Sequence, residues 1–236
     1  MNGSGKLIVA LDFSELDQAE KIVKKISGLV KIFKVGKELF TSAGPKAVEM
    51  IHRHNCRVFL DLKFHDIPNT VGAACESAAR MGVFMLNVHA LGGKTMMTSA
   101  VQAVHKAASE TKTTPTKVLG VTVLTSLKDL DLREVGISKK LEKEVEDLAV
   151  LSQRCGLDGV VASGQEVKRI RKVTGNNFLI VAPGVRPTWA AHGDQKRIVT
   201  PKEAIQSGAD FIVVGRPIIE HPQPLLAAEK ILKEIE

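Results

Sequence analysis

The stretch RVFLDLKFHDIPNT, residues 57–70, begins as a buried strand and ends among charged side chains. Because the side chains of a strand alternate between two faces, Asp61 and Lys63 point the same way and Leu60 and Leu62 take the opposite face. The leucines would face covering helices, which directs the charged pair toward the interior of the sheet. Charges in that position are costly unless they are paired. The stretch therefore indicates a covered sheet with a charged site at the end of one strand.

Seven further apolar runs of this kind alternate with helical patterns along the chain, without a linker-like interruption. Strands rich in Val, Ile and Leu that alternate with helices are typical of a parallel sheet covered on its outer face. Eight strand-then-helix units in 236 residues predict a single (β/α)8 TIM-barrel domain over residues 1–236. The expected strands are residues 7–12, 32–37, 57–63, 84–90, 117–126, 158–164, 178–185 and 210–218.

Capping signals and loops refine this expectation. Ser14 with Asp17 predicts an N-terminal capping box, and Thr200-Pro201-Lys202-Glu203 predicts a box with Pro at the first helical position. The polar stretch 127–140 is expected to be an inserted loop with short helical turns. A doubly wound open sheet is the alternative fold, but LDFSELD after the first strand lacks the Gly-rich fingerprint of that fold.

The composition, 44% hydrophobic and 25% charged, is that of a globular protein. No run approaches the roughly 18 apolar residues of a membrane span, and the N-terminal segment resembles a first strand more than a signal peptide. Three cysteines without CxxC spacing predict reduced thiols in a cytoplasmic protein. The net charge of +7 is spread among acids, and only 4% of residues are aromatic. We therefore expect small anionic ligands rather than nucleic acid.

Polar and charged side chains gather where the expected strands end, which is the face of a barrel that carries active sites. Two carboxylates about 4 Å apart repel by about 4 kcal/mol at an effective dielectric near 20, so Asp61 and Asp66 need the cations of Lys34 and Lys63. A structural ion-pair network is one interpretation. The other, which we favour, is a catalytic array in which protonated Lys63 delivers a proton to a developing carbanion.

Two loops after the last two expected strands, GVRP (184–187) and GRP (215–217), combine glycine with arginine. Glycine lets the backbone approach a ligand, helix N-termini favour anions, and arginine binds phosphate bidentately. GRP alone could be a helix-entry turn. Together with Gln195, the two loops predict a phosphate site.

Three other patterns carry less weight. GGKT (92–95) lacks the first glycine of a P-loop and is better explained as a helix start. His65 and His89 could bind a metal, but no third histidine supports them. Lys34 or Lys63 could form a Schiff base, but such a nucleophile needs an apolar surround and these lysines are flanked by carboxylates.

The residues Asp61 to Thr70 resemble the DxKxxDIPNT signature of the orotidine 5'-phosphate decarboxylase family. The resemblance extends over essentially the whole chain, through ALDF, FKVG, VTVLTS, APGVRP, GDQKRIVTP and VVGRPI. It implies a (β/α)8 barrel that acts as a homodimer, without a metal or an organic cofactor, and converts orotidine 5'-phosphate to UMP in the last step of UMP synthesis.

The resemblance also implies a role for each charged residue. Asp12 binds a ribose hydroxyl, and Lys34 bonds the ribose and holds Asp61. Asp61 lies against the substrate carboxylate, and Lys63 protonates the carbon that the carboxylate leaves. Asp66 reaches into the site of the partner subunit.

Further residues are implied to bind the substrate. Thr125 and Ser126 meet the edge of the pyrimidine, and Gln195 lies near both the base and the phosphate. Some members of the family contact the phosphate with a Tyr, which this chain lacks entirely. The other implied substrate-binding residues are Ile67, Thr70, Arg186, Gly215 and Arg216.

Two other functions stay open. A decarboxylase of the same superfamily acts on a sugar acid phosphate through an enediolate with magnesium, but such relatives carry an acid on strand two, where this chain has Lys34. A non-catalytic phosphate or nucleotide sensor would have no need of a buried proton donor such as Lys63.

Overall fold

The computed structural model describes residues 5–190 and 199–236, and in it eight parallel strands close into a barrel. Each strand pairs with the next in the sequence, and β8 pairs with β1 to close the sheet. The predicted (β/α)8 barrel is therefore confirmed. The strands are β1 (Leu7–Ala10), β2 (Ile32–Gly36), β3 (Arg57–Phe64), β4 (Met85–His89), β5 (Lys117–Val121), β6 (Gly159–Val161), β7 (Leu179–Ala182) and β8 (Phe211–Val214).

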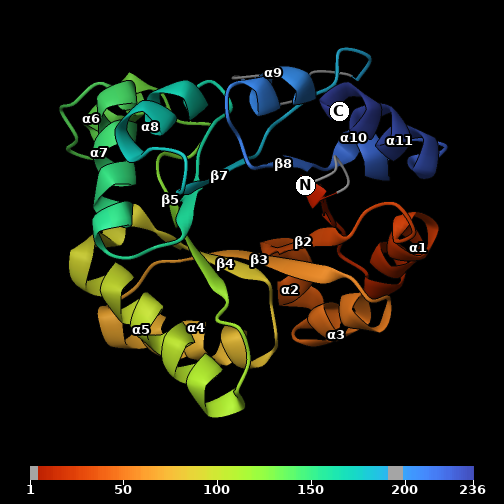
Figure 1. Cartoon of the computed structure of the whole chain (residues 1–236), viewed down its shortest axis with the longest axis horizontal. Helices are drawn as coiled ribbons and strands as arrows, with labels where there is room; N and C mark the ends of the chain where they lie inside the picture. The colour runs from red at the N-terminus through yellow and green to blue at the C-terminus, as the bar shows by residue number, and fades with distance from the viewer. Residues whose placement is uncertain (1–4, 191–198) are drawn as a thin grey trace.

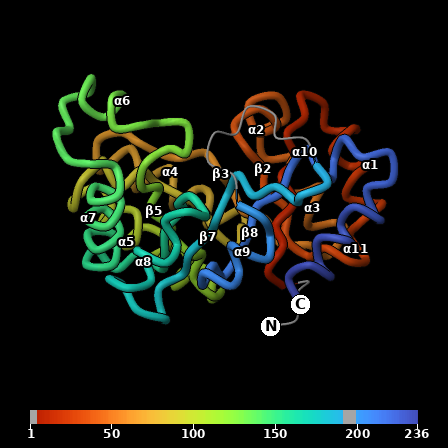
Figure 2. Tube along the Cα trace, turned by 90° about the horizontal axis from the view of Figure 1, so that it is seen from above, coloured from red at the N-terminus to blue at the C-terminus, as the bar shows by residue number. Residues whose placement is uncertain are grey.

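Helices connect the strands and surround them, as the coiled ribbons around the central arrows of Figure 1 show. Seen from above in Figure 2, α6 lies at the outer edge of the molecule, so the inserted stretch with a short helix after strand five is confirmed. The helices are α1 (Leu16–Ile26), α2 (Lys37–Ala43), α3 (Lys46–Arg53), α4 (Pro68–Arg80), the short 3-10 helix η2 (Ala90–Gly92), α5 (Gly93–Thr111), α6 (Asp129–Glu134), α7 (Leu141–Arg154), α8 (Val167–Thr174), α9 (Pro201–Gln206), α10 (Arg216–Ile219) and α11 (Pro224–Ile235).

All eight expected strands are present, but several end earlier than the sequence predicts. The last one was expected to run to residue 218, yet β8 ends at Val214 and a helix begins at Arg216. Pro217 has no N–H to continue the ladder but fits the first turn of a helix, so the longer strand prediction was wrong. The residues freed from the strand ends form the loops at the mouth of the barrel.

The two predicted capping boxes have opposite outcomes. At α9 the Thr200 hydroxyl accepts the N–H of Glu203 and the Glu203 carboxylate accepts the N–H of Thr200, which confirms the box. At α1 the prediction was wrong, because the N-cap is Glu15 rather than Ser14 and makes no side-chain cap bond. The Gln18 side chain donates to the Glu15 carboxylate instead.

Two apolar layers hold the barrel together. An inner layer fills the barrel, and an outer layer, which includes Leu60 and reaches Leu62, packs the strands against the helices. Since Phe59 belongs to the inner layer and Leu60 to the outer one, Asp61 continues the row that faces the interior. The inner layer consists of Ile8, Ala10, Ile32, Phe59, Met85, Leu119, Val121, Val161, Val181, Phe211 and Val213.

None of the described helices is long and apolar enough to cross a membrane. The cysteines Cys56, Cys75 and Cys155 are buried free thiols. Burial raises the pKa of Cys75 to about 12, so this thiol stays protonated and unreactive at neutral pH.

Candidate active site

Four charged side chains alternate in sign across the mouth of the barrel. Lys34 Nζ lies 3.0 Å from Oδ1 of Asp12 and 3.5 Å from Oδ2 of Asp61. Lys63 Nζ donates to the other oxygen of Asp61, Oδ1, at 2.6 Å. We call the four residues Asp12, Lys34, Asp61 and Lys63 the charge row. The predicted pairing of Asp61 with both lysines is confirmed.

The two central members of the charge row are deeply buried, with exposed fractions of 9% for Lys34 and 8% for Asp61. Burial alone would lower the pKa of Lys34, but the carboxylates of Asp61 and Asp12 raise it above its ordinary value. Burial alone would raise the pKa of Asp61, but the charges of Lys34 and Lys63 and the hydrogen bonds that Asp61 accepts lower it. Both groups are therefore charged at neutral pH.

The strand β3 is irregular where it carries these charges. Its register against β4 shifts between Leu60 and Phe64, so that the three residues from Asp61 to Lys63 lie opposite the single residue Asn87. Lys63 adopts a φ of 53°, in the left-handed region that costs a non-glycine residue roughly 1–2 kcal/mol. The side chains of Asp61 and Lys63 meet as predicted. However, a bulge rather than a regular strand orients them toward each other.

Asn87 fills the gap that the bulge leaves. Its side chain is fully buried, its Oδ1 accepts the backbone N–H of Lys63 at 2.8 Å, and its Nδ2 donates to Oδ1 of Asp61 at 2.7 Å. Asn87 lies in the middle of β4, and the sequence did not predict a role for it. The signal was its position within the apolar strand MLNVH, since a buried amide must find hydrogen-bond partners.

Gly36, at the end of β2, leaves room for the Lys34 ammonium. A Cβ atom at this position would lie 2.8 Å from Lys34 Nζ and 3.5 Å from Oδ1 of Asp12. The first of these distances is shorter than real Cβ contacts, so any side chain here would push the ammonium away. The glycine is thus part of the site.

A cavity of about 140 Å³ opens beside the charge row, with Lys34, Asp61 and Lys63 in its wall. Thr125, from the loop after β5, also lines it. This combination of a charged edge and apolar surfaces suits a ring that carries an anionic group. The rest of the wall is formed by Phe59, Val121, Val123, Leu124, Val161, Ala162, Pro183 and Val213.

A second cavity, of about 150 Å³, adjoins the first, because Lys34 lines both. Asp12, Arg186, Gly215 and Arg216 are also in its wall. Except for Gln195, which lies outside the described residues, the residues predicted to bind ribose and phosphate therefore line one cavity. Their arrangement forms a continuous groove from Lys34 to the two arginines.

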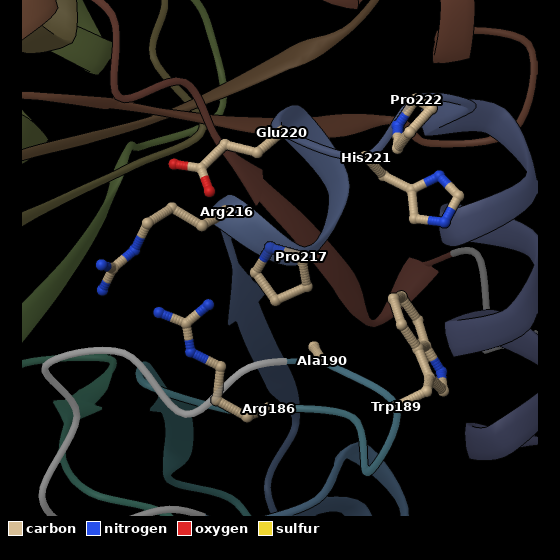
Figure 3. A pocket seen from close by; sticks show the side chains of 8 residues that line it. All are labelled: Arg186, Trp189, Ala190, Arg216, Pro217, Glu220, His221 and Pro222. Carbon is tan, nitrogen blue, oxygen red and sulfur yellow. The ribbon is translucent and has the colours of Figure 1, made fainter.

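The two arginines also line a third cavity, of about 320 Å³. Figure 3 shows the guanidinium groups of Arg186 and Arg216 on the same side of this cavity, with Trp189 on the other side. Arg186 is only 7% exposed, and its backbone N–H donates to the carbonyl of Val199 at 3.0 Å. This bond fixes the base of the Arg186 side chain beside the groove.

The remaining predicted residues lie apart from the charge row. Asp66 Oδ1 accepts the backbone N–H of Ile67 at 2.6 Å, and Asp66 makes no ion pair with any residue that the structure describes. The expectation from charge alone that Lys34 and Lys63 neutralise Asp66 within one chain is therefore wrong. Ile67 is 66% exposed, and Thr70 and Ser126 are exposed as well. Gln195 lies outside the described residues.

His65 and His89 lie near the charge row, with their ring centroids 5.2 Å apart. Within residues 5–190 and 199–236, no three His, Cys, Asp or Glu side chains are placed to hold a metal ion. Burial, together with electrostatic repulsion from the neighbouring His65, Lys63 and Lys37 side chains, lowers the pKa of His89 to about 4. His89 is therefore neutral at physiological pH.

Known proteins resemble this chain over nearly its full length. The family model described as "Orotidine 5'-phosphate decarboxylase / HUMPS family" matches residues 5–231. The orotidine 5'-phosphate decarboxylase of Syntrophotalea carbinolica is 52% identical over 98% of this chain and 94% of its own length, and that of Moorella thermoacetica is 49% identical over 100% and 94%. The crystal structure of orotidine 5'-phosphate decarboxylase from Lactobacillus acidophilus matches with a TM-score of 0.85 and 37% identity, over 98% of this chain and 99% of that one. This chain therefore belongs to the orotidine 5'-phosphate decarboxylase / HUMPS family.

Proposed function

We propose that this protein decarboxylates orotidine 5'-phosphate to UMP and CO2, the last step of de novo UMP synthesis, with Lys63 as the proton donor and without a cofactor. Relatives that bear the name of this activity share about half of their residues with the chain. The observation that carries the proposal is the Lys63 ammonium, held 2.6 Å from Asp61 in the wall of a cavity that is otherwise mostly apolar.

The chemistry follows from the placement of Lys63. Loss of CO2 from the pyrimidine leaves an electron pair on a ring carbon with little delocalisation. A lysine ammonium that is already oriented by Asp61 stabilises this charge electrostatically and then transfers a proton to the carbon. The Asp61 carboxylate, which is buried and ionised, repels the substrate carboxylate while CO2 leaves.

The groove beside the charge row accounts for the rest of the substrate. The ribose lies against Asp12 and Lys34, and the pyrimidine edge meets Thr125 and Ser126. Binding of the phosphate at the far end supplies energy that does not depend on the reacting carbon. The residues proposed to bind the phosphate are Arg186, Gln195, Gly215 and Arg216.

The position of Lys34 favours this reaction over a magnesium-dependent decarboxylation of a sugar acid phosphate. Its ammonium stands at the strand-two position where such relatives carry an acid, and it lies between the carboxylates of Asp12 and Asp61 and neutralises them. A cation supplied by the chain itself thus takes the place of a divalent metal in the charge balance of the site.

The test is an assay of the purified protein with orotidine 5'-phosphate, with and without EDTA, which follows substrate absorbance and UMP. We expect turnover that EDTA leaves unchanged. No turnover would refute the proposed reaction, and turnover that EDTA abolishes would refute the cofactor-free mechanism. Lys63→Ala should fold and lose nearly all activity, so near-normal turnover by this variant would remove Lys63 as the proton donor.

We further propose that the protein acts as a cytoplasmic homodimer in which Asp66, Ile67 and Thr70 of one chain contribute to the site of the other. The large exposed fraction of Ile67 and the absence of an ion pair at Asp66 among the described residues support this arrangement. The buried free thiols fit a reducing compartment.

The shared site can be tested by mixing two inactive variants, Lys63→Ala and Asp66→Ala. In a hybrid dimer, one of the two sites has both an intact Lys63 and the partner's intact Asp66, so an equal mixture should regain about a quarter of the wild-type activity. Subunit exchange is checked by native mass spectrometry. No recovery in a mixture that contains hybrid dimers would place Asp66 in its own chain's site.

A further inference from the structure

Asn87 links the two groups that act on the reacting carbon. We propose that the buried amide of Asn87 is a positioning residue, which sets the place of the Lys63 ammonium relative to the Asp61 carboxylate. The inference rests on the proposed role of Lys63 as the proton donor.

The first half of the argument concerns the backbone of Lys63. Three residues of β3 lie opposite one residue of β4. The regular ladder therefore cannot supply a hydrogen-bond partner for every backbone N–H within the bulge. The Lys63 N–H is instead accepted by Oδ1 of Asn87 at 2.8 Å. This bond holds Lys63 at a φ of 53°, which is unfavourable for lysine and from which its side chain reaches Asp61.

The second half concerns the carboxylate. Oδ1 of Asp61 accepts from both Lys63 Nζ at 2.6 Å and Asn87 Nδ2 at 2.7 Å, while Oδ2 faces Lys34 at 3.5 Å. The amide therefore fixes the rotation of the carboxylate that orients the ammonium. Only a neutral side chain with one acceptor and one donor can serve both partners here, because a carboxylate would repel Asp61 and an apolar group would bond neither.

Removal of the Asn87 amide should lower kcat and leave KM nearly unchanged. Asn87→Ala should lower kcat by about 10²-fold, the loss expected when a reacting group is misplaced by about 1 Å. KM should change by less than about threefold, because Arg186 and Arg216 still hold the phosphate. A kcat within a few-fold of wild type in the folded variant would overturn the inference.

The matched control is Thr116→Val. Thr116 is 6% exposed, and its Oγ1 donates to the carbonyl of Val83 at 2.8 Å. Thr116 directly precedes β5, so it lies at the opposite end of the barrel from the site. Its loss removes one buried hydrogen bond, so Tm should fall while kcat stays at the wild-type value. If Thr116→Val lowers kcat as much as Asn87→Ala does, the effect of Asn87 is general stability rather than positioning.

Acid rescue of Asn87→Asp gives a readout that a structural role would not produce. The charged groups around the new carboxyl are Asp61 and Lys63 of β3 and Lys34 of β2, and His89 follows on its own strand. When protonated, the carboxyl donates to Asp61 and accepts from the Lys63 N–H, as the amide does. The activity of the variant relative to wild type should therefore rise as the pH falls, by up to about tenfold per pH unit.

Three outcomes decide between this inference and the proposed function. If Asn87→Asp is inactive at neutral pH and its activity relative to wild type does not change with pH, the positioning role of Asn87 is overturned. If Lys63→Ala is inactive while Asn87→Ala keeps its kcat, only the role of Asn87 fails. If Lys63→Ala is active, the proposed role of Lys63 itself fails.

Discussion

Lys34 Nζ lies 3.5 Å from Oδ2 of Asp61, at a place where each side chain is only 11% exposed. Water cannot replace either partner there, so the loss of one leaves a buried charge with too little compensation. We expect Lys34→Met to destabilise the protein by about 3–5 kcal/mol, the range for breaking a buried ion pair. Denaturant unfolding with urea measures the change in the free energy of unfolding.

The control for Lys34→Met is Lys24→Met on α1. Lys24 Nζ lies 3.4 Å from Glu20 across one helical turn, with the lysine side chain 60% exposed. Such a surface pair contributes about 0.3–0.5 kcal/mol, so this variant should unfold almost as the wild type does. Equal losses in the two variants would mean that burial does not decide the strength of the Lys34–Asp61 pair.

The lowered pKa of Asp61 makes the stability of the fold depend on pH. A carboxyl whose folded pKa lies below its unfolded value stabilises the fold above the unfolded value, here 3.8, and this contribution is lost as the pH falls through the folded pKa. Asp61→Asn lacks the contribution at every pH. The difference in unfolding free energy between wild type and Asp61→Asn should therefore shrink below about pH 4, and a constant difference from pH 7 to pH 2 would contradict the lowered pKa.

The sequence was sufficient to predict the barrel and the members of the charge row. Strand-forming runs and helical periodicity are local signals, and a closed parallel sheet brings the ends of all its strands to one face. The pairing of Asp61 with Lys34 and Lys63 followed from the cost of burying unpaired charges, and it did not require the structure.

The bulge in β3 and the role of Asn87 could not be predicted in the same way. A period of two residues gives no sign of extra residues in one strand, because the bulge depends on the register between β3 and β4. Asp66 shows a different limit. A charge argument paired it with Lys34 and Lys63 of its own chain, but among the described residues it bonds only the adjacent N–H of Ile67. The register between strands decides the first case, and the position of Asp66 in the turn beyond β3 decides the second.

A methyl group at Gly36 should displace the Lys34 ammonium and so lower activity. In Gly36→Ala the Cβ would lie 2.8 Å from Lys34 Nζ, so the ammonium must move away from Asp12 and Asp61. The backbone of Gly36, with φ of −91° and ψ of −176°, suits alanine, so the effect comes from the contact alone. We expect kcat/KM to fall at least about tenfold, as a loss of about 1.4 kcal/mol in transition-state binding would give.

Gly28→Ala is the matched control for Gly36→Ala. A Cβ at Gly28 would meet no heavy atom within 4 Å. The variant should therefore keep the wild-type kcat/KM and Tm, because it changes a glycine to alanine in open space. A similar loss of activity in both variants would show that the contact with Lys34 is not the cause.

The two arginines of the groove should bind the substrate through its phosphate and not through its pyrimidine. Arg216→Ala removes a guanidinium from the cavity that adjoins the charge row, while leaving Asp61 and Lys63 in place. A hydrogen bond to a charged group contributes about 1.5–3 kcal/mol, so kcat/KM for orotidine 5'-phosphate should fall by about 10- to 200-fold. Orotidine, which has no phosphate, should react equally with wild type and variant.

The control is Arg169→Ala, which removes a surface arginine paired with Glu146 at 3.5 Å and should leave the kcat/KM of both substrates unchanged. If Arg216→Ala instead lowers kcat/KM equally for both substrates, Arg216 acts at the reacting ring and not at the phosphate.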